Sequence, residues 1–255
     1  MATHVLIPGS GDSSWYWHLL AAELRERGHD VVAPDLPIED DTAGLWQYAD
    51  TAVEAIGDRR DLVVVAQSAG AFTAPLICER VPVDLLVLLA GMVPLPGEPP
   101  EDWWANTGCA QARREQDERD GRAPDDMIAL FMQDVPADLA AEAFRRERHQ
   151  SETPGRKPWP LAAWPNVPTR FLLCRDDRLF PADFMRRVVR ERLGITPDEI
   201  DGSHCVALSR PKELAERQER AAPSCRRRGL GCPPPGAELT ACRQRPAGRC
   251  QRAWR

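Results

Sequence analysis

The sequence predicts an α/β protein in which a mostly parallel sheet of about six strands is flanked by helices. Short apolar runs alternate with amphipathic stretches along the chain, which is typical of such a sheet. The run at 62–65 is apolar at every position instead of alternating, as a strand buried on both faces requires. The 255 residues, 43% of them hydrophobic, are enough for a core of ordinary size. The predicted strands are residues 4–7, 30–33, 62–66, 85–90, 169–174 and about 198–200.

The first predicted strand is followed by a loop, residues 8–12, that reads PGSGD. Its glycines can adopt conformations that turn backbone amides inward, toward an anion. A glycine-rich loop at this place can also hold a nucleotide phosphate. The third glycine of the dinucleotide fingerprint and the Walker lysine are both missing, so we expect no nucleotide cofactor.

The predicted strand at 62–66 ends in the turn AQSAG, residues 66–70, and a helical pattern follows. A serine on such a turn exposes its hydroxyl at the carboxyl end of the strand, which makes Ser68 the candidate nucleophile. The usual first residue of this pattern is glycine, whereas Ala66 adds one methyl group. The alternative is a strand-to-helix turn that contains serine by chance.

An acid and a histidine follow two later strands. The run at 169–174 leads into Asp176 and Asp177, and the short strand at 198–200 leads to His204. Parallel strands end at the same edge of a sheet, so we expect these side chains near Ser68. A serine hydroxyl is a weak nucleophile at neutral pH, and an imidazole must take its proton while a carboxylate orients the ring. The residues alone leave Asp176 and Asp177 as alternatives.

These motifs resemble those of the α/β-hydrolase superfamily over residues 1 to about 219. The chain is most similar to small esterases of the plant methylesterase and hydroxynitrile lyase group. The segments that carry the resemblance are GSG at 9–11, SWYW at 14–17, APDLP at 33–37, the Ser68 turn, GSH at 202–204 and LSRP at 208–211.

The resemblance implies a catalytic triad of Ser68, Asp177 and His204. Asp177 is preferred because its spacing to Pro181 resembles the family pattern G-x-x-D-x-x-x-P, with Cys174 in the glycine position. It also implies an oxyanion hole formed by the backbone amides of Ser10 and Ala69. Two departures matter: Pro8 stands where the family often has histidine, and Cys205 stands where hydroxynitrile lyases carry lysine.

Residues 95 to about 164 contain no strand run and are interpreted as a helical cap inserted over the active site. Four prolines near residues 94–100 mark its entrance. We expect its large apolar residues to pack between helices; the alternative is that they line an acyl pocket. These residues are Trp103, Trp104, Met127, Ile128, Phe131, Met132, Leu139 and Phe144.

Residues 221–255 differ from the predicted catalytic domain at 1–220. They contain four cysteines, eight arginines and one acid, Glu238, and show no hydrophobic period. We predict a disordered basic tail. Binding of nucleic acid or an anionic membrane is the alternative. The cysteine spacings fit no zinc pattern.

The sequence therefore predicts a serine hydrolase that cleaves a small carboxylic ester through an acyl-enzyme, with no cofactor or metal and no nucleic-acid or membrane partner. Scattered cysteines and the lack of a signal pattern at residues 1–7 favour the cytoplasm. A hydroxynitrile lyase or C–C bond hydrolase with the same triad is one alternative, and a non-catalytic ligand-binding protein on this fold is another.

Overall fold

A computed structural model describes residues 1–122 and 126–221. In this part of the chain, parallel strands form a six-stranded sheet in the order β2-β1-β3-β4-β5-β6. The predicted fold class is confirmed, and each predicted strand end lies within one residue of the observed one. The strands are β1 (Thr3–Ile7), β2 (Asp30–Val32), β3 (Leu62–Gln67), β4 (Leu85–Leu89), β5 (Thr169–Cys174) and β6 (Asp198–Ile200).

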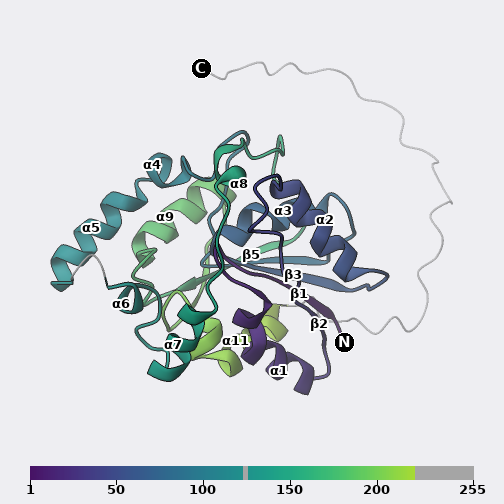
Figure 1. The fold of residues 1–255 in the computed structure, drawn as a ribbon, viewed down its shortest axis with the longest axis horizontal. Helices are drawn as coiled ribbons and strands as arrows, with labels where there is room; N and C mark the ends of the chain where they lie inside the picture. The colour runs from purple at the N-terminus through teal and green to yellow at the C-terminus, as the bar shows by residue number, and fades with distance from the viewer. Residues whose placement is uncertain (123–125, 222–255) are drawn as a thin grey trace, which may run out of the picture. The chain divides into compact units, whose positions relative to one another are not determined.

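Helices cover both faces of this sheet. On one side α1 (His18–Glu26) packs against α11 (Pro211–Ala221), and on the other α2 (Leu45–Ile56) packs against α3 (Ala74–Cys78) (Figure 1). The central strands β1, β3 and β4 are buried at every position. This explains why β4 and residues 62–66 of β3 are apolar without alternation. The other helices outside the segment between β4 and β5 are η1 (Ser14–Trp17), η2 (Ser68–Phe72), α9 (Ala182–Leu193) and α10 (Val206–Ser209).

The described residues between β4 and β5 form helices and no strand. They lie on the side where the parallel strands end (Figure 1). Trp103 is fully buried and contacts the rings of Phe180 and Phe184, which anchors this insertion to the body. A buried ion pair between Glu98 and Arg192 of α9 holds its entrance. The helices are α4 (Trp103–Thr107), α5 (Cys109–Asp120), α6 (Met127–Phe131), α7 (Ala137–Arg145) and α8 (Thr153–Arg156).

Two further features predicted from the sequence are the basic tail and the lack of a membrane-spanning helix. The proposed basic tail lies, from residue 222 on, outside the described residues. Within residues 1–122 and 126–221, no helix has the length and apolar character needed to cross a membrane.

Candidate active site

The turn after β3 holds Ser68 in a strained conformation. Its φ angle is 51°, a left-handed value that residues other than glycine seldom adopt. The loop after β1 passes so close that a Cβ on Gly70 would lie 2.5 Å from the carbonyl oxygen of Pro8, and one on Gly9 would lie 2.4 Å from Gln67 Oε1. Glycine at both positions therefore lets the two segments meet. Ala66 is fully buried, so the core accommodates its extra methyl group.

Asp177 and His204 form a buried pair beyond the ends of β5 and β6. His204 Nδ1 lies 2.7 Å from Asp177 Oδ2. The other oxygen of this carboxylate accepts the amides of Leu179 and Phe180, each at 2.9 Å. A carboxylate can only accept, so Nδ1 carries the proton and Nε2 is left as the free base. The arrangement thus fixes both the ring orientation and the tautomer.

The neighbouring acid, Asp176, has a different contact. Its side chain is exposed, and Oδ2 accepts the amide of Gly202 at 2.9 Å. The backbone carbonyl of Asp176 accepts a hydrogen bond from Gln133 at 2.6 Å. Asp176 therefore braces the loop that carries His204, whereas Asp177 contacts the imidazole. The two adjacent acids therefore point in different directions, and the one that contacts the imidazole is the one that the family resemblance preferred.

Ser68 and His204 line the same cavity, of about 370 Å³, which we name the Ser68 cavity. Residues of the insertion form much of its wall. Trp104, Met127, Phe131, Met132 and Phe144 all line it, so the pocket alternative holds for these five residues. The packing expectation holds for Trp103. The rings of Phe131 and Phe180 stand edge-on to His204, with centroids 5.5 and 5.1 Å away.

Ser10 and Ala69, predicted to form the oxyanion hole, lie on the wall of the Ser68 cavity. Within the described chain the amide of Ser10 donates no hydrogen bond. Ala69 lies in the first turn of η2, where backbone amides have no partner inside the helix. Both amides are therefore available to an anion in the cavity.

Gln150, which sequence reasoning missed, holds the loop that carries Ser10. Its Oε1 accepts the amide of Gly11 at 3.4 Å, and its Nε2 donates to Tyr48 Oη at 3.0 Å. The amide of Arg148 adds a bond of 2.8 Å to the carbonyl of Gly11. No sequence signal links these segments, because Gln150 lies 139 residues from Gly11.

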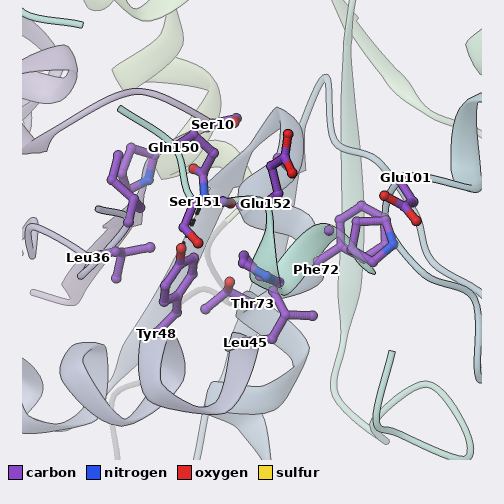
Figure 2. A pocket seen from close by; sticks show the side chains of 18 of the residues that line it. Ser10, Leu36, Leu45, Tyr48, Phe72, Thr73, Glu101, Gln150, Ser151 and Glu152 are labelled. Atoms are coloured by element: carbon purple, nitrogen blue, oxygen red, sulfur yellow. Dashed lines mark hydrogen bonds between the residues drawn. The ribbon is translucent and has the colours of Figure 1, made fainter. Parts of the chain in front are cut away.

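A second cavity, of about 310 Å³, lies behind the same wall, and we name it the Tyr48 cavity. Ser10 and Ala69 line it as well, but Ser68 and His204 do not. Leu36, Leu45 and Tyr48 surround it from the β2 side (Figure 2). Ser10 and Ala69 thus lie where the two cavities adjoin, and only one of these cavities is lined by the candidate nucleophile.

The family model described as "Alpha/beta hydrolase family" matches residues 5–217, which is more than half of the chain. The chain belongs to the α/β-hydrolase family. Among curated proteins, this α/β-hydrolase is 25% identical over 249 residues to Esterase PIR7B of Oryza sativa subsp. japonica, covering 83% of this chain and 92% of the relative. It is 21% identical over 246 residues to Norfluorocurarine synthase 1 of a Strychnos species, with the same coverage.

Solved structures show the same fold. An extracellular α/β-hydrolase from a Paenibacillus species has a TM-score of 0.72 and 20% identity to this α/β-hydrolase, covering 87% of this chain and 99% of that one. Polyneuridine aldehyde esterase has a TM-score of 0.68 and 20% identity, covering 86% and 98%. These relatives confirm the expected similarity to small plant esterases.

Asp12 is the second residue that sequence reasoning missed. It is the acidic residue of the 8–12 loop, and its partly buried carboxylate lines the Ser68 cavity of this α/β-hydrolase. Burial raises the pKa of Asp12 to about 6; the positive charge that His204 can carry opposes the rise and Glu147 adds to it. Asp12 directly follows Ser10 and Gly11 in the sequence. This position next to the predicted oxyanion loop could have identified it as a residue of the site.

Cys205 follows His204 and also lines the Ser68 cavity. Burial raises the pKa of its thiol well above the ordinary value, and nearby carboxylates, first that of Asp12, add to this. The side chain is therefore a neutral thiol at physiological pH. Within residues 1–122 and 126–221, no group of three His, Cys, Asp or Glu side chains is placed to hold a metal ion.

Proposed function

We propose that this α/β-hydrolase is a serine esterase that cleaves small carboxylic esters through an acyl-enzyme. The observation that carries the proposal is the buried Asp177–His204 contact of 2.7 Å, with Ser68 on the wall of the same cavity. Relatives named as esterases support the reaction class. A small-molecule ester is then the partner, and the reaction needs only side chains, backbone amides and water.

The reaction proceeds in two halves. Ser68 Oγ attacks the ester carbonyl carbon while His204 Nε2 takes its proton, and the oxyanion accepts hydrogen bonds from the amides of Ser10 and Ala69. The carbonyl re-forms, the C–O bond breaks, and His204 protonates the departing alkoxide. Water then attacks the acyl-enzyme, gives its proton to His204, and displaces Ser68, which recovers that proton as the acid leaves.

The lining of the Ser68 cavity favours an esterase over a hydroxynitrile lyase. A lyase must stabilise departing cyanide, which calls for a positive charge beside the histidine. The neutral thiol of Cys205 occupies the adjacent position, and within the described chain no lysine or arginine lines this cavity. An esterase has no such need, because His204 itself protonates the leaving group.

The test is labelling with a fluorophosphonate probe together with hydrolysis of short-chain p-nitrophenyl esters. We expect Ser68→Ala to abolish labelling and to lower kcat/KM by at least ~10³, because the triad acts as a unit. Ser14→Ala is the matched control, since Ser14 lines neither cavity. Labelling that persists in Ser68→Ala would exclude Ser68 as the nucleophile.

Two further outcomes separate the alternatives. Enzyme-dependent cyanide release from mandelonitrile with negligible ester cleavage would favour the lyase. A folded wild-type protein that neither labels nor cleaves any ester would favour a non-catalytic binding protein. We also propose a cytoplasmic location, which fractionation of cells that express the full chain would test.

A further inference from the structure

The Ser68 cavity has an unbalanced charge. Its lining contains three acids, Asp12, Glu101 and Glu147, and within the described chain it contains no lysine or arginine. Of the three, Glu101 has a neighbouring cation, Arg156, at 4.0 Å. Aromatic rings form much of the remaining wall, and they belong to Phe72, Trp104, Phe131 and Phe144. A cavity that combines carboxylates with aromatic faces attracts cations and repels anions.

Asp12 and Glu147 have no partner inside the described protein. Neither carboxylate accepts a hydrogen bond or forms an ion pair with residues 1–122 or 126–221, whereas neighbouring arginines bond elsewhere. Arg146 pairs with Glu142, and Arg148 pairs with Glu39. A partly buried carboxylate without a partner lowers stability, and such a group is retained at functional sites more often than elsewhere.

The two carboxylates lie close together over the loop that carries Ser10. The side chain of Glu147 lies 3.5 Å from the position that a Cβ on Gly11 would occupy, and its charge acts on Asp12. Glu147 is exposed, whereas Asp12 is partly buried. Glu147 therefore stands at the outer part of the cavity, and Asp12 stands deeper, near enough to His204 to feel its charge.

We infer that the Ser68 cavity selects esters that carry an ammonium group, with Asp12 as the residue that contacts the cation. This inference rests on the proposed esterase function and names the substrate class of that same site. An ammonium group next to Asp12 gains a charge-assisted contact inside a space partly closed to water. The aromatic rings that line the cavity add cation–π attraction.

A different role for Asp12 makes a different prediction. The carboxylate could act on His204 alone and stabilise the imidazolium that forms during attack. Removing its charge would then slow neutral and cationic esters by the same factor. A role in cation recognition instead changes the ratio of the two rates, so this ratio is the quantity to measure.

The test uses substrates matched in shape and different in charge. On the acyl side these are p-nitrophenyl esters of 4-(trimethylammonio)butanoate, of its neutral isostere 5,5-dimethylhexanoate, and of the anionic glutarate monoester. On the alcohol side they are choline and 3,3-dimethylbutyl esters of one acid. We expect the wild type to prefer the cationic member over the neutral one by on the order of 10-fold in kcat/KM in at least one series. The glutarate ester should be the poorest acyl substrate.

Three variants test which carboxylate causes the preference for cationic esters. Asp12→Asn should bring the cationic-to-neutral ratio close to one, and Glu147→Gln should lower it less, because its exposed charge is screened by salt. Asp138→Asn removes the same charge from an exposed residue of α7 that lines neither cavity, and should leave the ratio unchanged. Circular dichroism confirms that each variant is folded.

Each result points to one conclusion. A wild-type ratio near one in both series, or a ratio that Asp12→Asn leaves intact, overturns the inference while esterase activity on neutral substrates still stands. A fall in the ratio with Asp138→Asn equal to that with Asp12→Asn also overturns it, because the effect would come from net charge. If no ester is cleaved and Ser68 is not labelled, the proposed function itself fails.

Discussion

The two cavities share a wall that includes Ser10 and Ala69, but they compensate their acids differently. In the Tyr48 cavity Arg156 pairs with Glu152 and lies 4.0 Å from Glu101, while leucines and the ring of Tyr48 form the rest of one side (Figure 2). In the Ser68 cavity Asp12 and Glu147 have no such partner within the described residues. An ester has two parts on either side of its carbonyl. On the proposed esterase function, we therefore expect a charged part of the substrate in the Ser68 cavity and an uncharged part in the Tyr48 cavity.

The largest expected effect is on catalysis, and it concerns Asp177, the acid that contacts His204. Asp177→Asn should lower kcat on a neutral p-nitrophenyl ester by about 10⁴-fold, because an amide no longer holds His204 in the required tautomer. Asp176→Asn is the matched control. That side chain is exposed and braces Gly202, so we expect a change of no more than about threefold. Equal losses in the two variants would remove the distinction between these neighbouring acids.

The sequence could predict the sheet because buried parallel strands contain apolar runs, such as residues 62–66 and 85–89, and all six strands end within one residue of the predicted ends. It also indicated the residues that the structure brings to one edge, since Ser68, Asp177 and His204 each follow a strand. The residues alone left Asp176 and Asp177 as alternatives, and only the spacing to Pro181, through the family resemblance, favoured Asp177.

Other parts of the site depend on contacts between distant segments. The bond from Gln150 to the loop of Gly11, and the unpartnered state of Asp12, arise only when the insertion meets the loop after β1. No local period or motif encodes such a contact. The same limit applied to Trp104 and Met127, whose helical spacing is equally compatible with packing and with a cavity wall.

The second prediction tests the Tyr48 side alone. Leu45 begins α2 and lines the Tyr48 cavity but not the Ser68 cavity. Leu45→Trp should fill this space and lower kcat/KM for esters with long uncharged chains by about 10-fold, as loss of hydrophobic contact does in other pockets. Activity on the acetyl ester should change little. If chain length has no effect in either protein, the uncharged part of the substrate does not enter the Tyr48 cavity.

The smallest expected effect is on the melting temperature. It is measured in variants that each change one acid, from the Ser68 cavity or from the Tyr48 cavity. Burial raises the pKa of Asp12 from 3.8 to about 6, so between these values the folded protein binds more protons than the unfolded chain. Stability therefore falls as pH rises through that window, and the full penalty is present above about 6. Asp12→Asn removes the charge and should raise Tm at pH 8 by about 2–4 °C, with a gain that vanishes near pH 4.

Glu152→Gln is the matched variant from the Tyr48 cavity, where the carboxylate is exposed and paired with Arg156. Since an exposed pair contributes little, this change should leave Tm nearly constant at both pH values. Differential scanning calorimetry measures the melting temperature of both variants.

A saturating cationic ester analogue should stabilise the wild type at pH 8 and should stabilise Asp12→Asn much less, because the ligand supplies the missing partner of the Asp12 carboxylate. A Tm gain for Asp12→Asn that is independent of pH would mean that the carboxylate is not the source of the penalty, and the difference between the two cavities would then lie in their shape alone.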